Sequence, residues 1–239
     1  ALLLLAEASP RDPYYVANGF DAAYDWTGEL GQWAWHDAFG RGVPTPRRLR
    51  AALTASGATP PDRVFRFINN NDTAARFVTR HGAGRTRVAA ALLMTLPGLP
   101  LVYTGDEVGA EYEPYKGPPP LDWKDRHGLR AHYRRLVALR AADPALRGPD
   151  LRLLDASPDD RVLAYLRPGA SAAEDRIVLL NFGEAAVRAR LAADGWTGTG
   201  FRDLLNGGVV VVDPAAPAID LPAFGIRVLA LDAPDQEGP

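Results

Sequence analysis

The sequence predicts an α/β fold in which a parallel, barrel-type sheet with intervening helices is followed by an antiparallel β-sandwich. Up to residue 143, apolar runs of strand length alternate with long helical patterns, a rhythm typical of parallel sheets. Two of these runs end in an acid, Glu7 and Asp72. Strands of (β/α)8 barrels deliver catalytic groups at their carboxyl ends in this way. After residue 144 the segments become short and β-rich and are separated by Gly, Pro and Asp, which is typical of a sandwich.

Four strands and four helices are expected in the first part. The run 2–6 is continuously apolar, the pattern of a parallel strand covered on both faces. The helical segments follow from apolar spacing and from Pro or Gly near their ends. The expected strands are 2–6, 21–26, 64–69 and 100–104, and the expected helices are 28–39, 46–56, 84–96 and 129–142.

The second part is expected to be an antiparallel sandwich of six to eight strands. The recognisable strands are 161–167, 176–182, 187–191, 209–213 and 225–231. The domain boundaries that follow are 1–143 for the barrel-type part, 144–232 for the sandwich and 233–239 for a polar tail.

Composition excludes several classes of function. A net charge of −2 and a pI near 6.1 give no electrostatic reason to expect nucleic acid or an anionic membrane as partner. No apolar stretch reaches the roughly 18 residues of a membrane span. There is no cysteine, and the four histidines lack metal-site spacing, so no metal or cofactor is expected in this chain. Residues 1–8 resemble the end of a secretory signal, but the basic region and longer apolar run are absent, which favours a strand.

Glu7 is the first candidate catalytic residue, because five apolar residues precede it. A carboxyl enclosed by hydrophobic walls has a raised pKa and can hold a proton near neutrality, as a general acid must. The alternative is a strand-end glutamate that points to solvent.

Asp72 is the second candidate, at the end of Asn69-Asn70-Asn71-Asp72. A fixed carboxylate there could hydrogen-bond sugar hydroxyls and stabilise an oxocarbenium-like transition state. The alternative is a simple turn, since Asn and Asp favour Asx turns.

Asp106 and Glu107 follow the fourth expected strand. Barrel geometry alone would allow a catalytic role for one of them, but the preferred interpretation is a buried acid that holds the loops. Aromatic residues gather in the same loops and could stack on sugar rings or fill the core: Tyr14, Tyr15, Trp33, Trp35, Tyr112 and Trp123.

Taken together, four segments resemble glycoside hydrolase family 13, the α-amylase family. Residues 4–8 (Leu-Leu-Ala-Glu-Ala) resemble its fifth-strand motif, and residues 20–25 resemble its sixth strand. Residues 67–72 resemble the seventh-strand motif Phe-x-x-Asn-His-Asp, and residues 98–109 resemble the eighth-strand segment. The resemblance implies the C-terminal half of a (β/α)8 TIM barrel, strands five to eight, followed by the family's C-terminal β-sandwich.

The family implies a retaining glycosidase that acts on α-glucosidic bonds of starch-like or maltooligosaccharide substrates. In its double displacement, Glu7 would be the general acid/base and Asp72 would stabilise the transition state. Asn71 would bind substrate, in the place of the family's histidine, although it cannot carry imidazolium charge. The family's nucleophile, an Asp in a Gly-Phe-Arg-x-Asp-like motif, has no counterpart here.

These departures predict a fragment of a longer enzyme, or a truncated gene product, that is nearly inactive alone. Its partner would be the missing N-terminal barrel half, and the full-length enzyme could bind calcium. The alternative is a non-catalytic carbohydrate-binding or scaffold protein built from a degenerate half barrel.

Overall fold

The computed structural model describes residues 2–25, 35, 38–39, 42–54, 59–113, 115–117, 120–192 and 198–231. Most of the helix expected at 28–39 and the tail expected at 233–239 lie outside these residues. Among the helices of these ranges, none has the length and apolar character needed to cross a membrane.

The first sheet has four strands, all parallel, in the order β1-β2-β3-β4. Ala6 pairs with Ala23 and Phe65 pairs with Leu99. Each strand is shorter than predicted, because only two residues of each neighbouring pair of strands are paired in the parallel ladder. The strands are β1 (Leu5–Ala6), β2 (Ala22–Tyr24), β3 (Val64–Arg66) and β4 (Leu99–Pro100).

The start of the chain differs from the expected buried strand. The exposed fractions of Leu2, Leu3 and Leu4 are 87%, 57% and 47%, whereas Ala6 is buried. The prediction that the run 2–6 is covered on both faces is therefore wrong. The reason is that the described residues place no covering layer over residues 2–4, and β1 has a single neighbouring strand, β2, in the described sheet.

The helices follow the prediction in part. The last long helix has the predicted bounds, and the helix expected at 84–96 begins earlier, at Phe77. Gly82 interrupts it with a φ of 76° and a ψ of 165°, a conformation open to glycine without steric cost. The helices are α1 (Tyr14–Ala17), α2 (Thr45–Thr54), α3 (Phe77–Thr95), α4 (Leu129–Ala142) and α5 (Pro144–Arg147).

The second part is an antiparallel sandwich with nine strands among the described residues, more than the six to eight expected. One sheet has the order β11-β10-β13-β8-β7-β5 and the other the order β12-β9-β6. The strands are β5 (Arg152–Leu154), β6 (Ala156–Ser157), β7 (Val162–Arg167), β8 (Arg176–Asn181), β9 (Val187–Leu191), β10 (Gly200–Asp203), β11 (Val209–Val211), β12 (Ala218–Leu221) and β13 (Ile226–Leu231).

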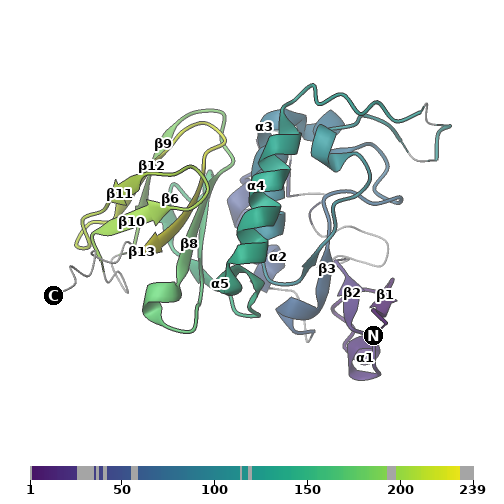
Figure 1. Cartoon of the computed structure of the whole chain (residues 1–239), viewed down its shortest axis with the longest axis horizontal. Coiled ribbons are helices and arrows are strands. Elements are labelled where there is room, and N and C mark those ends of the chain that lie inside the picture. The colour runs from purple at the N-terminus through teal and green to yellow at the C-terminus, as the bar shows by residue number, and fades with distance from the viewer. Residues whose placement is uncertain are drawn as a thin grey trace.

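Figure 1 shows α3 and α4 between the parallel sheet and the sandwich. A single apolar cluster crosses this junction: Leu92 of α3 and Leu136 of α4 belong to it together with Leu163, Val178 and Val228 of the six-stranded sheet. A second, smaller cluster lies between the two sandwich sheets, around Leu179 and Ile219. The barrel part and the sandwich therefore share one core.

Polar contacts at the same junction satisfy the end of α3. The Thr95 and Tyr165 hydroxyls lie 2.5 Å apart, and the Arg167 guanidinium donates to the Thr95 carbonyl. Arg140 donates to the carbonyls of Met94, Leu96, Leu146 and Gly98. The carbonyls of residues 94–98 have no further helical donor past the end of α3, and these side-chain donors replace it; Arg140 also ties the Leu146 carbonyl of α5 to the same place.

Candidate active site

Glu7 directly follows β1, at the carboxyl end of the parallel sheet. Its side chain is exposed. The apolar enclosure expected around this carboxyl is therefore not formed by the described residues, and the position matches the alternative of a strand-end acid facing solvent. Its catalytic role stays a prediction.

Asp72 lies in a turn between β3 and α3. Its backbone N–H donates to Asn70 Oδ1 over 2.9 Å, and the Asn70 N–H donates to Thr73 Oγ1 over 3.0 Å. The Asx turn weighed for this segment is thus present. The turn leaves the Asp72 carboxylate exposed in the loop after β3, so a turn and a site residue are compatible here.

Asn71, the predicted substrate-binding residue, contacts Asp72 and a tyrosine of the loop beyond β4. Its Nδ2 lies 3.0 Å from both Asp72 Oδ1 and the Tyr115 hydroxyl. The Tyr115 hydroxyl in turn donates to Asp72 Oδ1 over 3.2 Å. Two donors therefore bind the same carboxylate oxygen. Sequence reasoning did not single out Tyr115, because 43 residues separate it from Asp72.

Tyr24, at the end of β2, links the two predicted acids. Its ring packs against Phe65 and Phe67, with centroids 5.3 and 5.8 Å away. Burial, and then the negative charges of Glu7 and Asp72, raise the pKa of the Tyr24 hydroxyl. Both carboxylates therefore lie within electrostatic range of one side chain, at the same end of the sheet.

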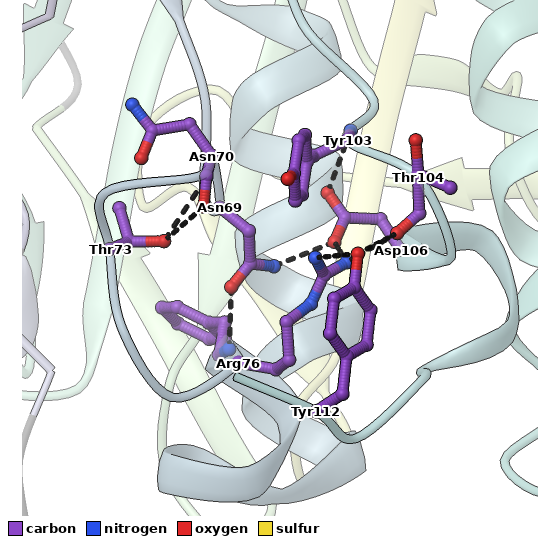
Figure 2. Close-up of polar contacts among 9 residues, drawn as sticks. Asn69, Asn70, Thr73, Arg76, Tyr103, Thr104, Asp106 and Tyr112 are labelled. Carbon is purple, nitrogen blue, oxygen red and sulfur yellow. Dashed lines mark hydrogen bonds and ion pairs between the residues drawn. The ribbon is translucent and has the colours of Figure 1, made fainter. Parts of the chain in front are cut away.

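Asp106 is the buried acid beside this site, 3% exposed. Its Oδ1 accepts hydrogen bonds from Asn69 Nδ2 at 2.7 Å and Arg76 Nη2 at 2.5 Å. Its Oδ2 accepts the backbone N–H of Tyr103 at 3.1 Å. Figure 2 shows these donors converging on the carboxylate. The preferred interpretation of Asp106 as a buried acid that holds the loops is confirmed.

Arg76 is as deeply buried as its partner. Its guanidinium carbon lies 4.8 Å from the ring centroids of both Tyr103 and Tyr112. The guanidinium also donates to the Thr104 carbonyl over 3.0 Å. Cation–π contacts of this kind are worth most when desolvated. The arginine therefore joins the loop after β4 to the start of α3 (Figure 2).

Electrostatics at Asp106 are a balance of opposing effects. Burial raises the pKa of Asp106 to about 7. The positive charge of Arg76 and the Asn69 hydrogen bond act in the opposite direction, because both stabilise the ionised form. Burial is the larger effect, so the carboxyl titrates near neutrality.

The sequence of this chain is similar to those of two curated enzymes. The chain is 31% identical over 213 residues to α-amylase MalA of Haloarcula japonica, an alignment that covers 86% of this chain and 30% of the relative. It is 33% identical over 114 residues to a cyclomaltodextrinase of a Bacillus species, which covers 44% of this chain and 20% of the relative. The relatives of this chain are members of the α-amylase family, and the resemblance covers most of the chain.

Solved structures of the α-amylase family show the same fold. A maltogenic α-amylase from Thermotoga neapolitana superposes with a TM-score of 0.74 at 19% identity, covering 98% of this chain and 55% of that one. An α-amylase from Geobacillus thermoleovorans, solved with acarbose, gives 0.75 at 20% identity, covering 97% and 53%. The architecture is thus a partial α-amylase-family barrel with its C-terminal sandwich.

The chain spans about half the length of these solved structures and about a third or less of the curated relatives. No family model matches the chain. Within the described ranges, no group of three or more His, Asp or Glu residues could hold a metal ion.

The aromatic residues of the loops divide between surface and interior. Tyr14 and Trp123 are 62% and 52% exposed, whereas Trp35 is buried in the core. Tyr112 stacks on Arg76. Trp33 lies outside the described residues. Among the residues around the predicted acids, sequence reasoning did not single out Tyr24, Asn69, Arg76 and Tyr115, whose partners come from distant segments.

Proposed function

We propose that this chain supplies the general acid/base and the transition-state-stabilising carboxylate of a retaining α-glycosidase. The observation that supports it is that Glu7 follows β1 and Asp72 lies in the loop after β3 of the same parallel sheet. Beyond the larger effect of burial, both carboxylates are close enough to Tyr24 to raise the pKa of its hydroxyl. The relatives named amylase and cyclomaltodextrinase suggest starch-like or maltooligosaccharide substrates.

In the proposed reaction, Glu7 protonates the glycosidic oxygen of the leaving group while a carboxylate nucleophile bonds to the anomeric carbon. Glu7 then takes a proton from water, or from a sugar hydroxyl, whose oxygen displaces the nucleophile. Asp72, ionised, stabilises the positive charge that develops on the ring. The nucleophile would come from the part of the family barrel that has no counterpart in these 239 residues.

The exposure of Glu7 sets a requirement on the complete site. A general acid needs a pKa raised toward neutrality, which burial against apolar walls provides. We place that wall in the complementary half of the barrel. The chain alone would then be nearly inactive, since loss of a covalent nucleophile cost about a million-fold in another hydrolase.

A non-catalytic carbohydrate-binding protein is the second candidate. Two observations favour it: Glu7 is exposed, and Asn71 stands where the family has a histidine. A binder needs hydroxyl-binding groups such as Asn71 and Asp72, but it has no use for a proton donor.

The substitution Glu7→Gln separates the two candidates in a protein with the complete barrel. Turnover of maltooligosaccharides should fall about 100- to 10,000-fold, the usual contribution of general acid–base catalysis. Sugar binding, measured by calorimetry, should change little because Gln keeps the shape of Glu. Glu174→Gln, the same change in the sandwich, is the matched control and should leave turnover unchanged.

Turnover that survives Glu7→Gln would show that Glu7 is not the acid. Sugar binding without turnover in the unsubstituted protein would establish the second candidate. The pH dependence adds an independent criterion, because a working acid/base pair gives a bell-shaped profile of kcat/KM. Hydrolysis at ordinary enzyme rates by the homogeneous 239-residue chain would contradict the proposed need for a complementary half.

A further inference from the structure

A cavity of about 360 Å³ lies between the α3–α4 pair and the sandwich. It is formed by residues that take no part in the site described above. Arginine and histidine side chains line it, and none of its lining residues is acidic. Its polar lining is Arg87, His132, Arg135, Asn206 and Arg227, and its apolar lining includes Leu205, Phe224 and Ile226.

Two of the three arginines carry charge that no acidic side chain of the described chain neutralises. Arg135 is exposed on α4 and makes no ion pair with a described residue. Arg87 uses one nitrogen to bind the carbonyls of His127 and Gly128. Arg227 differs because its Nη1 pairs with Asp203 Oδ2 at 2.8 Å. The cavity therefore holds about two uncompensated positive charges.

The positive charges of the cavity also act on the imidazole of His132, which is buried beside it. Its Nε2 lies 2.9 Å from the Arg87 carbonyl oxygen. Burial first, and then the positive charges of Arg87 and Arg135, lower the pKa of the His132 imidazole, while the hydrogen bond acts the other way. Both guanidinium groups are thus close enough to act on one buried ring.

The lining matches one class of ligand. Guanidinium groups bind carboxylate and phosphate through paired hydrogen bonds. A phosphate monoester carries a charge of about −1.5 to −2 at pH 7, which matches two free arginines better than a single carboxylate would. The volume falls at the lower end of the roughly 300–1,000 Å³ of small-molecule pockets, and the apolar wall could contact a small organic body.

We propose that this junction cavity binds a phosphate dianion, either free phosphate or the phosphoryl group of a small sugar phosphate, between Arg87 and Arg135. Both arginines come from the helix pair, and sandwich residues such as Asn206 and Arg227 close the other side of the cavity, so the anion would lie at the junction of the two parts of the chain. It would do so at a place separate from the glycosidic site.

Calorimetric titration of the 239-residue chain with inorganic phosphate tests the proposal, with glucose 6-phosphate and glucose in parallel. Phosphate or glucose 6-phosphate should bind with a Kd of about 1 mM or tighter, and glucose should not. The substitution Arg135→Gln should weaken binding at least about tenfold, because it removes one of two free guanidinium groups. Arg134→Gln, at the preceding exposed residue of the same helix, should change binding less than about twofold.

Preference for glucose 6-phosphate would identify a sugar phosphate site, and equal affinity for both would identify a free phosphate site; both support the proposal. If Arg134→Gln and Arg135→Gln weakened phosphate binding equally, the loss would reflect the net charge of the chain and not a specific site, which would overturn the proposal. So would absence of binding in a chain that melts cooperatively. Since Arg135 contacts no described residue by hydrogen bond, its substitution should leave the melting temperature without ligand unchanged, which separates lost binding from misfolding.

Discussion

Asn69 and Asp106 are joined by a 2.7 Å hydrogen bond from the Asn69 amide to Asp106 Oδ1. The side-chain oxygen of the same amide, Asn69 Oδ1, accepts the Phe77 N–H at the start of α3 over 2.7 Å. Arg76 reaches the same carboxylate from the end of the same segment. Asp106 therefore holds both ends of the 69–77 loop, and Asp72 lies between the two attachments. We infer that Asp106 is a positioning residue for Asp72.

The Arg76–Asp106 ion pair should be costly to break from one side. In Arg76→Met a buried carboxylate loses its counter-charge, so the free energy of unfolding should fall by about 3–5 kcal/mol. The double variant Arg76→Met/Asp106→Leu should lose clearly less than the two single variants added together, because no charge is stranded. Denaturant unfolding followed by circular dichroism measures both. Arg134→Met is the exposed control. If it lowered the free energy of unfolding as much as Arg76→Met, the loss would not be specific to the buried ion pair.

The raised pKa of Asp106 predicts a specific pH dependence of stability. The unfolded carboxyl ionises near pH 3.8, whereas the folded one holds its proton until about pH 7. Between these values the folded state binds more protons, so the free energy of unfolding falls as pH rises, by at most about 1.4 kcal/mol per pH unit. The stabilising contribution is complete below pH 3.8 and is lost above pH 7.

The substitution Asp106→Asn isolates this contribution. The unfolding free energy of the unsubstituted chain minus that of Asp106→Asn should decrease as pH rises from 4 to 7, because only the unsubstituted chain loses the bound proton. A difference that grows with pH would mean that the folded carboxylate is ionised throughout and that Arg76 outweighs burial.

Arg140 offers a second test of stability, at the junction of barrel and sandwich. Arg140→Leu leaves four carbonyls that are at least partly buried without this donor. An unsatisfied buried acceptor costs about 1–3 kcal/mol, and neighbouring relaxation reduces the sum, so we expect a loss of about 3–5 kcal/mol. Thermal melting checks it. Arg134→Leu on the same helix should have little effect, and a neutral Arg140→Leu would show that water replaces the guanidinium.

Tyr115→Phe tests the hydrogen bonds at the proposed site without disturbing the fold. Tyr115 is 75% exposed, so stability should not change. Loss of the hydroxyl frees Asp72 Oδ1 from one of its two donors. In a protein with the complete barrel, kcat/KM should fall about 2- to 10-fold, the value of one hydrogen bond. Tyr14→Phe is the exposed control. If both substitutions lowered kcat/KM equally, Tyr115 would have no specific role at the proposed site.

Sequence patterns predicted the parallel strands, α4 and most of the long sandwich strands, because apolar periodicity in these segments is strong. The strands β5, β6, β10 and β12 were missed because each is short and has few consecutive apolar residues, whereas the equally short β11 lies in a run of four valines. The burial of Asp106 was foreseen, but its partner Arg76 was not, because 30 residues separate them. The exposure of Leu2 could not follow from an apolar run, which shows hydrophobicity and not the number of neighbouring strands.

The apolar cluster that crosses from α3 and α4 to the six-stranded sheet has a consequence for how such chains can be recombined. The sequence changes from helical to β-rich patterns near residue 144, but the packing is continuous there, because residues from both parts form one apolar core. A gene chimaera joined at that point would combine two surfaces that had not been selected together, and large apolar side chains would meet without matched shapes. An exchange of sandwiches between relatives should therefore succeed only when the facing residues of α3 and α4 are transferred with them.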